Sequence, residues 1–397
     1  MKFANKILLL FIGLFAVSCV DPYQLESNTF EEALVIEATL TNQLKYQEVK
    51  ISKTFKLEET LPIIVTDAEV SISDDLGNNY AFTASNGLFV SNSPFQAVTG
   101  RNYKLRIASG GKIYESSAEM LSESQPIESV TTSEESKNGE RGVQIKVNSV
   151  DPTGNSKYYR YSYEETYKVI APYWSEYVAV IEQDAEYGMS IADEIFLVPH
   201  TYEARTCYST AYSTDLYLTK TVGLSEDRVE DFPIRFIKVT DPIIQNRYSI
   251  NVIQYVQSLA AYTFYETLAE LSAAGENIFS QNQPGFFYGN ISSISNPSDK
   301  VIGFFEVSGV AEKRIFFNFE DIFPNDVLPP FLFDCEIIEL DSTAFGPGNR
   351  QGATLRTALL NRKALYYTHA FPIYSVVRPE CADCTTFSSN VIPSFWE

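Results

Sequence analysis

Short runs in which apolar and polar residues alternate, separated by turn-forming residues, fill residues 33–120. Successive side chains of a strand point to opposite faces, so this period of two predicts strands that each bury one face. Leu34, Ile36, Ala38 and Leu40 form the first such face. No helical pattern intervenes, which argues against a parallel α/β sheet. We therefore expect an antiparallel sandwich of immunoglobulin-like size over residues 33–120.

Turn signals and composition support this interpretation. Residues 74–78 and 85–87 carry the Asp, Asn and Gly residues that hairpin turns require. The chain holds 27 Phe and 25 Tyr but only 2 Trp. Aromatic and β-branched residues favour pleated, half-buried surfaces, so the whole chain is expected to be mainly β.

A polar stretch that ends at Pro126 is expected to link the sandwich to a larger β-rich domain, residues 126–397. Alternating or apolar runs there predict further strands at 144–150, 157–170, 232–239 and 247–256. Residues 301–306 and 314–319 are expected to form an adjacent pair, with a turn near Ser308 and Gly309.

One prominent helix is predicted near residues 259–274. Its apolar residues recur at helical spacing, and Gly275 is a natural C-cap. The apolar stripe comprises Tyr262, Tyr265, Leu268, Ala269 and Leu271. Such a stripe more often packs into a core than forms a cofactor site, so core packing is the preferred interpretation.

The N-terminus has the organisation of a signal peptide rather than of a fold element. Lys2 and Lys6 precede an apolar run from Ile7 to Val17, which is too short to span a bilayer. No later run reaches the length of a membrane-spanning helix. We therefore assign residues 1–18 to a signal that is removed on export.

Cys19 is the expected site of lipid attachment. Small residues at 16–18 precede it, as in the lipobox of bacterial lipoproteins. A thiol there can take a diacylglyceryl thioether, and several acyl chains anchor a protein firmly to a membrane. Residues 19–32 would then form a lipidated tether. The alternative is an ordinary secretory signal with an incidental cysteine.

The chain is acidic, with a formal net charge of −21 at pH 7. Such a field disfavours nucleic acids and anionic lipid headgroups as direct ligands. It is also typical of exported proteins that acidic surfaces keep soluble.

Four further cysteines lie far from the N-terminus: Cys207, Cys335, Cys381 and Cys384. An even number in an exported chain predicts two disulfides, for which three pairings exist. A short ring closed by Cys381 and Cys384 is one of the options. A zinc site would need four converging ligands and commonly a second close pair, so it is the weaker alternative.

An aromatic cluster is the most interesting candidate for binding. Tyr159, Tyr161 and Tyr163 fall on one face of a predicted strand, and Trp174 follows closely. Such a surface can stack on sugars or bury a large area at a protein interface. The competing interpretation, which we favour, is that these rings fill the core.

Catalytic motifs are absent from the sequence. There is no nucleophile elbow, phosphate-binding loop, dinucleotide fingerprint or zinc-protease motif, and the two histidines, His200 and His369, lie far apart. We therefore expect no enzyme activity, no cofactor and no metal site. An enzyme would need a pocket where one histidine meets a nucleophile and a carboxylate.

The order of several motifs along the chain resembles the Bacteroidota lipoprotein family known as domain of unknown function 4249. The similar segments are residues 34–38 with 41–42, 68–74, 100–105, 111–114, 158–161, 247–250, 289–290, 381–384 and 393–396. One departure is the loop at residues 385–390, which lacks the glycine pair expected there.

The resemblance implies an outer-membrane lipoprotein, often encoded near a TonB-dependent transporter, and it implies no catalytic residues. Acidic residues after Cys19 are only scattered, so the sequence assigns neither a surface-facing nor a periplasm-facing orientation. The leading hypothesis is an accessory or ligand-capturing partner of such a transporter, with an unknown ligand. The alternative is a structural or adhesive envelope protein that presents β-sandwich surfaces.

Overall fold

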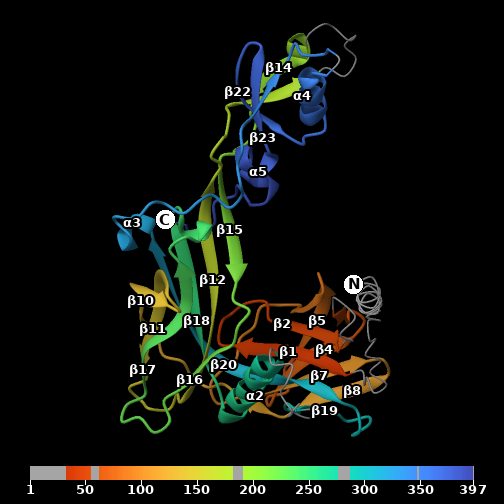
Figure 1. Ribbon diagram of the computed structural model, residues 1–397. Coiled ribbons are helices and arrows are strands. Elements are labelled where there is room, and N and C mark those ends of the chain that lie inside the picture. The colour runs from red at the N-terminus through yellow and green to blue at the C-terminus, as the bar shows by residue number, and fades with distance from the viewer. Residues whose placement is uncertain (1–32, 55–61, 182–190, 276–286, 347, 397) are drawn as a thin grey trace, which may run out of the picture.

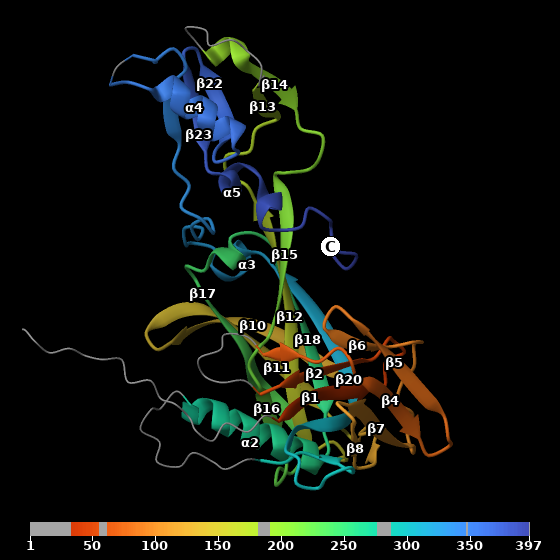
Figure 2. The ribbon, with the colours of Figure 1, turned by 90° about the vertical axis from the view of Figure 1, so that its right-hand side faces the viewer.

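The computed structural model describes residues 33–54, 62–181, 191–275, 287–346 and 348–396. Strands predominate and helices are few, so the prediction of a mainly β chain is confirmed. The molecule is elongated (Figures 1 and 2). Its base holds the N-terminal strands and a central sheet, and a smaller distal module stands on the long strands β12 (Tyr158–Ile170) and β15 (Thr206–Tyr212).

Nine strands come from the N-terminal part of the chain. They are β1 (Leu34–Thr41), β2 (Glu48–Lys53), β3 (Ile63–Ile64), β4 (Glu69–Asp74), β5 (Asn79–Ser85), β6 (Leu88–Ser91), β7 (Asn102–Ser109), β8 (Lys112–Ser116) and β9 (Glu119–Met120). The two predicted turns join β4 to β5 and β5 to β6. At the first turn the Asp74 carboxylate accepts hydrogen bonds from the backbone N–H groups of Leu76 and Asn78, at 3.1 and 2.9 Å, which fixes the reversal of the chain.

The predicted face of β1 is buried as expected. Leu34, Ile36, Ala38 and Leu40 belong to one core with the inward residues of β2, β4 and β7. This core also contains residues from two strands far along the chain, β19 (Ile291–Ser293) and β20 (Val301–Phe317). The sheet curls so that β19, paired with β8, returns to contact β20.

The expected hairpin over residues 301–319 is wrong, because β20 is one continuous strand of 17 residues. Its first half pairs in parallel with β1, from Leu34 opposite Val301 to Thr41 opposite Ser308. Its second half pairs in antiparallel fashion with β18 (Tyr248–Val256). The parallel pairing is also a departure from the antiparallel sandwich that the sequence predicts.

The boundary expected near residue 120 therefore does not separate two cores. The N-terminal core is completed by β19 and β20, which lie within the range 126–397. The reason is the length of β20, which is sufficient to cross from one core to the other.

Gly309 does not form a turn but permits a close approach between backbones. Its N–H donates to the Ser122 carbonyl at 2.7 Å, and a Cβ atom at this position would lie 2.4 Å from the same oxygen. A glycine inside a strand often marks such an approach, which explains why a turn signal occurs in the middle of β20.

The central part of the base has two layers around a second core. A three-stranded sheet packs its inward residues against β12, β18 and the end of β20. The remaining elements here are β10 (Ile127–Lys137), β11 (Glu140–Val150), β16 (Tyr217–Lys220), β17 (Arg228–Lys238) and α3 (Phe319–Ile322). The strands predicted at 144–150, 157–170, 232–239 and 247–256 are confirmed with small differences in their ends.

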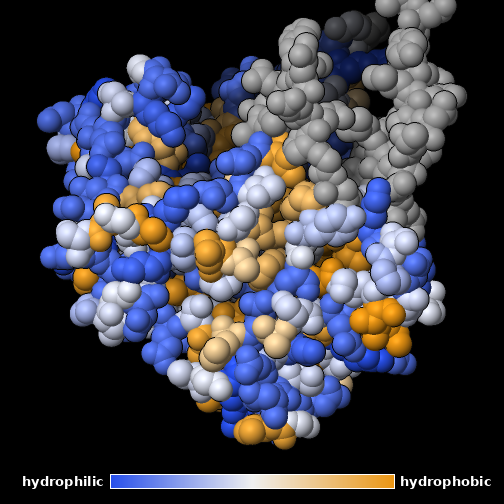
Figure 3. Space-filling view, turned by 90° about the horizontal axis from the view of Figure 1, so that it is seen from below, coloured by the Kyte–Doolittle hydropathy of each residue, from blue (hydrophilic) through white to orange (hydrophobic). Residues whose placement is uncertain are grey.

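The prominent helix is also confirmed as α2, Leu259–Gly275. It lies at the bottom of the base, across the outer side of β20 and next to β12 and β16 (Figure 1). Hydrophilic residues cover most of the lower face, with smaller groups of apolar residues between them (Figure 3).

The expected domain 126–397 contains a separate module at the far end of the molecule. Its elements are β13 (Tyr177–Ile181), β14 (Ile195–Pro199), β21 (Ile338–Asp341), α4 (Gln351–Leu360), β22 (Leu365–Ala370), β23 (Ile373–Val377) and α5 (Pro379–Ala382). It has a core of its own, built around Leu355, Val376 and Tyr374. The chain enters it after β12 and returns to the base through β15, then enters it a second time after α3.

All four distal cysteines form disulfides. Cys207 on β15 pairs with Cys384, and Cys335 pairs with Cys381 on α5. The short ring between Cys381 and Cys384 is therefore wrong, and no thiolate of these four remains for zinc. The bridges close loops of 177 and 46 residues. Long closures restrict the unfolded chain most, so they stabilise the junction between module and base.

We predict that Gly309→Ala destabilises the protein. The added methyl group must displace the backbone around Ser122, and overpacking of this kind costs about 2 kcal/mol or more of the free energy of unfolding. Urea denaturation followed by circular dichroism measures the change. Gly346→Ala is the control, because no atom lies within 4 Å of its added Cβ. Equal stabilities of the two variants would contradict the role assigned to Gly309.

Candidate functional site

The outer side of the sheet is only partly covered, because α2 packs mainly against β12, β16 and β20. On β1 the residues that alternate with the core face, Val35, Glu37, Thr39 and Thr41, all line an open groove. On β20, Phe304 packs against Ala261 and Phe264 of α2. The groove thus lies beside the helix, where the N-terminal strands meet the central sheet.

The groove has a volume of about 1020 Å³. Binding sites for small molecules typically measure about 300–1,000 Å³, so the space is of ligand size. Further lining residues come from the β1–β2 loop, β2, β12, the segment before β16, β18, α2 and β20: Lys45, Glu48, Lys50, Arg160, Thr214, Asp215, Tyr255, Tyr265, Leu268 and Ile302.

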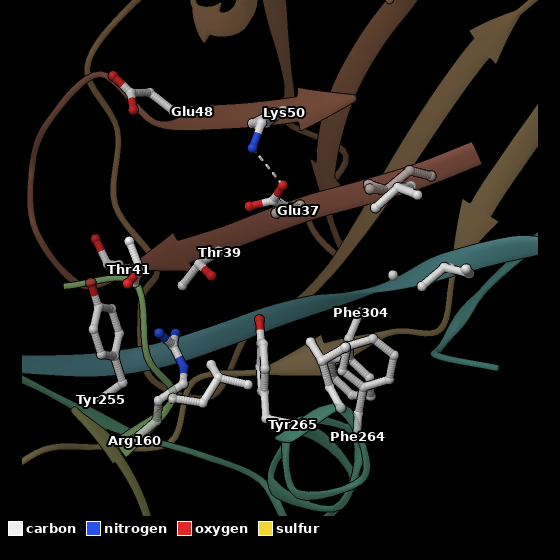
Figure 4. Close-up of a pocket in the computed structure, with 18 of the residues that line it drawn as sticks. Glu37, Thr39, Thr41, Glu48, Lys50, Arg160, Tyr255, Phe264, Tyr265 and Phe304 are labelled. Carbon is white, nitrogen blue, oxygen red and sulfur yellow. Dashed lines mark hydrogen bonds and ion pairs between the residues drawn. The ribbon is translucent and has the colours of Figure 1, made fainter. Parts of the chain in front are cut away.

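Arg160 on β12 lies between Tyr255 and Tyr265 in the lining of this site. Its guanidinium carbon lies 4.0 Å from the centre of the Tyr255 ring and 4.8 Å from that of Tyr265, so it is held between two aromatic faces (Figure 4). A guanidinium is attracted electrostatically to such faces. Arg160 Nη2 also donates to Glu306 Oε2 at 2.9 Å, and this ion pair joins β12 to β20.

Glu306 is buried, with 1% of its side chain exposed. Gln257 Nε2 donates to its other oxygen at 3.0 Å, and the Ser308 hydroxyl also donates to it. A buried charge is tolerated when hydrogen bonds and an opposite charge surround it. Glu306 is therefore the support that fixes Arg160 below the groove.

Both ionisable partners of Glu306 keep their usual protonation state. Burial lowers the pKa of the Arg160 guanidinium, but the Glu306 charge and the two tyrosines outweigh it and raise the pKa above its ordinary value. Burial also raises the pKa of the Tyr265 hydroxyl, and Glu306 adds to that effect. Arg160 is thus a permanent cation and Tyr265 a neutral phenol at neutral pH.

One donor of Arg160 has no partner among the described residues. Its Nε–H is buried and donates to no acceptor among the described residues, although the side chain lines the groove. A buried donor without a partner is unusual in folded proteins and calls for a specific explanation. At the mouth of the groove, Lys50 and Glu37 form an exposed ion pair at 2.8 Å.

The predicted aromatic surface is wrong for three of its four residues. Tyr159, Tyr161 and Tyr163 do share one face of β12, but that face is buried, with 2%, 1% and 7% exposure. They pack between the two layers of the central core, as the competing interpretation expected. The Tyr159 hydroxyl is hydrogen-bonded to Asp227 Oδ1 at 2.8 Å, so even its polar end is occupied.

Trp174 lies elsewhere, at the junction between base and module. It packs near the Cys207–Cys384 bridge, and with His200 and Tyr202 it lines a shallow pocket of about 440 Å³. The Arg205 guanidinium lies 5.8 Å from its ring centre. The structure thus separates Trp174 from the three tyrosines.

The two histidines occupy different environments. His200 lies next to Trp174, whereas His369 on β22 stacks against Tyr374 and is hydrogen-bonded through Nδ1 to the Tyr366 hydroxyl at 2.8 Å. Among the described side chains, no group of three or more His, Cys, Asp or Glu residues is arranged to hold a metal ion.

Sequence reasoning missed the residues at the centre of the groove. Core packing is confirmed for part of the predicted stripe, since Tyr265 and Leu268 pack against the buried Phe264. These two side chains, together with Ala269, also line the open site. Arg160 stands among tyrosines in residues 158–161. A lone cation within an aromatic strand was the available signal, because it must point away from the core face of that strand.

Cys19 and the signal segment fall outside the described residues. Within the part of the chain that the structure does describe, no helix is long and apolar enough to cross a membrane.

The fold and the groove define a mainly β protein with a ligand-sized site where the N-terminal and central strands join in one continuous sheet. The chain belongs to the family described as "Domain of unknown function (DUF4249)", whose model matches residues 20–314. A search of curated proteins finds no match.

Among solved structures, the chain has a weak similarity to that of the manganese lipoxygenase of Gaeumannomyces graminis with part of the zonadhesin of Komagataella pastoris. It is 10% identical, and the alignment covers 57% of this chain and 89% of that one, with a TM-score of 0.14. So low a score carries no argument about fold or function.

We predict that Tyr159→Phe lowers the free energy of unfolding by about 1–3 kcal/mol, because buried Asp227 loses a hydrogen bond. Tyr212→Phe is the control, since Tyr212 is 70% exposed and its change should stay within about 0.5 kcal/mol. Thermal or urea denaturation measures both. An unchanged free energy of unfolding in Tyr159→Phe would be inconsistent with the core position of this tyrosine.

Proposed function

We propose that this protein is an outer-membrane lipoprotein that captures a ligand in the groove beside α2 and works next to a TonB-dependent transporter. Its role is binding rather than catalysis. The observation that carries the proposal is the groove itself, with the buried cation Arg160 in its lining and one donor of that cation unpaired. Binding sites of this kind combine apolar walls with a few fixed polar groups.

The membrane attachment in this proposal rests on the sequence. The short apolar segment before Cys19 and the small residues at 16–18 are typical of a lipoprotein signal. The outer membrane and the transporter rest on the resemblance to lipoproteins of this family. The charge of −21 argues against nucleic acid as the ligand.

We predict that a TonB-dependent transporter co-purifies with the lipoprotein from outer membranes dissolved in a mild detergent. Cys19→Ser removes the thiol needed for a thioether, so this variant should appear in the soluble fraction and without transporter. Mass spectrometry of the purified material identifies the partner. If the wild-type protein is recovered from the membrane without a transporter, the result supports the lipid anchor but contradicts the partnership.

A second candidate is a structural or adhesive envelope protein, which the distal module favours. Along β13 and β14 the inward residues pack into the module core, yet the opposite face is apolar as well. Val180, Phe196 and Val198 on that face are 46%, 50% and 41% exposed. An apolar face of this kind at the tip of a monomer often marks a contact site.

This second candidate predicts that Phe196→Ser combined with Val198→Thr weakens cell attachment to a surface, whereas the thermal stability of the protein changes little. A strain without the gene should attach poorly and grow normally on every nutrient. Attachment assays and growth curves measure the two effects. Loss of growth on one particular nutrient would favour ligand capture instead.

A further inference from the structure

The two ends of the groove differ in chemistry. On one side of Tyr265 lie Phe264 and Phe304, whereas Arg160 and Tyr255 lie on the other side (Figure 4). The hydroxyl groups of Thr39 and Thr41 lie toward Arg160 and Tyr255, and Leu268 and Ile302 add apolar side chains to the lining. A ligand that fills the whole groove must therefore have an apolar body and a polar head.

The head group that fits the polar end is an anion. A guanidinium has five N–H donors in a rigid fork, and carboxylates bind two of them side by side. Glu306 accepts from Nη2 of Arg160, whereas the buried Nε atom has no partner. The protein alone thus leaves part of this fork unsatisfied.

The local charge also permits an anion. Three acidic residues line the groove, Glu37, Glu48 and Asp215, and three basic residues line it as well, Lys45, Lys50 and Arg160. The buried Glu306 behind Arg160 adds one negative charge, so the local sum is −1. Over the whole chain the formal charge is −21. The groove is therefore one of the places where an anionic group meets little of the general repulsion.

We infer that the groove binds an amphipathic carboxylate, whose carboxylate contacts Arg160 and whose apolar chain extends past Tyr265 to Phe264 and Phe304. This inference rests on the proposed function in taking the groove as the ligand site. It adds the chemical class of the ligand and the residue that selects it.

The test uses the mature full-length protein and a neutral fluorophore, aminoanthracene, that reports on an apolar site. Decanoate and decanol, which differ in their head group, are titrated as competitors. Decanoate should displace the fluorophore at a roughly tenfold lower concentration than decanol, because charge-assisted hydrogen bonds are the strong ones.

Arg160→Gln alone leaves Glu306 buried without its cation. The decisive variant therefore combines Arg160→Gln with Glu306→Gln, because it keeps a neutral pair in the same space. This double variant should bind decanol as the wild type does and lose the preference for decanoate. Glu306→Gln alone should strengthen decanoate binding, since a competing carboxylate is gone. Arg228→Gln, at a residue that does not line the groove, should change neither affinity. Melting temperatures verify that each variant is folded.

The outcomes separate the two claims. Equal displacement by decanoate and decanol in the wild type would overturn the carboxylate head while leaving the groove as a binding site. A preference that survives in the double variant would overturn the role of Arg160. No binding of fluorophore or competitor to the wild type would overturn the groove as ligand site, and with it the proposed capture function.

Discussion

The pairing of β20 with strands from both halves of the chain is the constraint on which the rest of the structure depends. Its first residues complete the N-terminal core beside β1, and its last residues close the central core beside β18. Because β20 contributes residues to both cores, it fixes the position of one core relative to the other. The groove beside α2 exists because of this arrangement, since its walls come from β1 on one side and from β12 and β18 on the other.

The electrostatics of the site follow from the same strand. Glu306 lies on β20 and Arg160 on β12, so their ion pair crosses β18, which separates those strands in the sheet. Removal of either partner would leave a buried charge, which costs far more than the pair contributes. The main role of this ion pair is thus to position Arg160 rather than to stabilise the fold. It holds a cation at the floor of a groove in an acidic protein.

Local patterns were sufficient to predict much of this fold. The alternation on β1, the turn at Asp74 and the spacing of α2 each depend on neighbours in sequence, and each was predicted. The parallel pairing of β1 with β20 joins residues more than 260 positions apart, and no local signal specifies it. For β12, the shared face of Tyr159, Tyr161 and Tyr163 was predicted, but which side of the sheet the core would cover was not.

The choice of which β12 face packs into the core decides which side chains can line the groove. Along β12, alternation places the tyrosines on one face of the strand and Arg160 on the other. The pattern alone does not say which of these two faces packs into the core. If the tyrosines faced outward, the strand would bury Arg160 in an apolar core without compensation, which is the costlier arrangement. The tyrosine face of β12 therefore packs into the core, and Arg160 on the opposite face lines the groove.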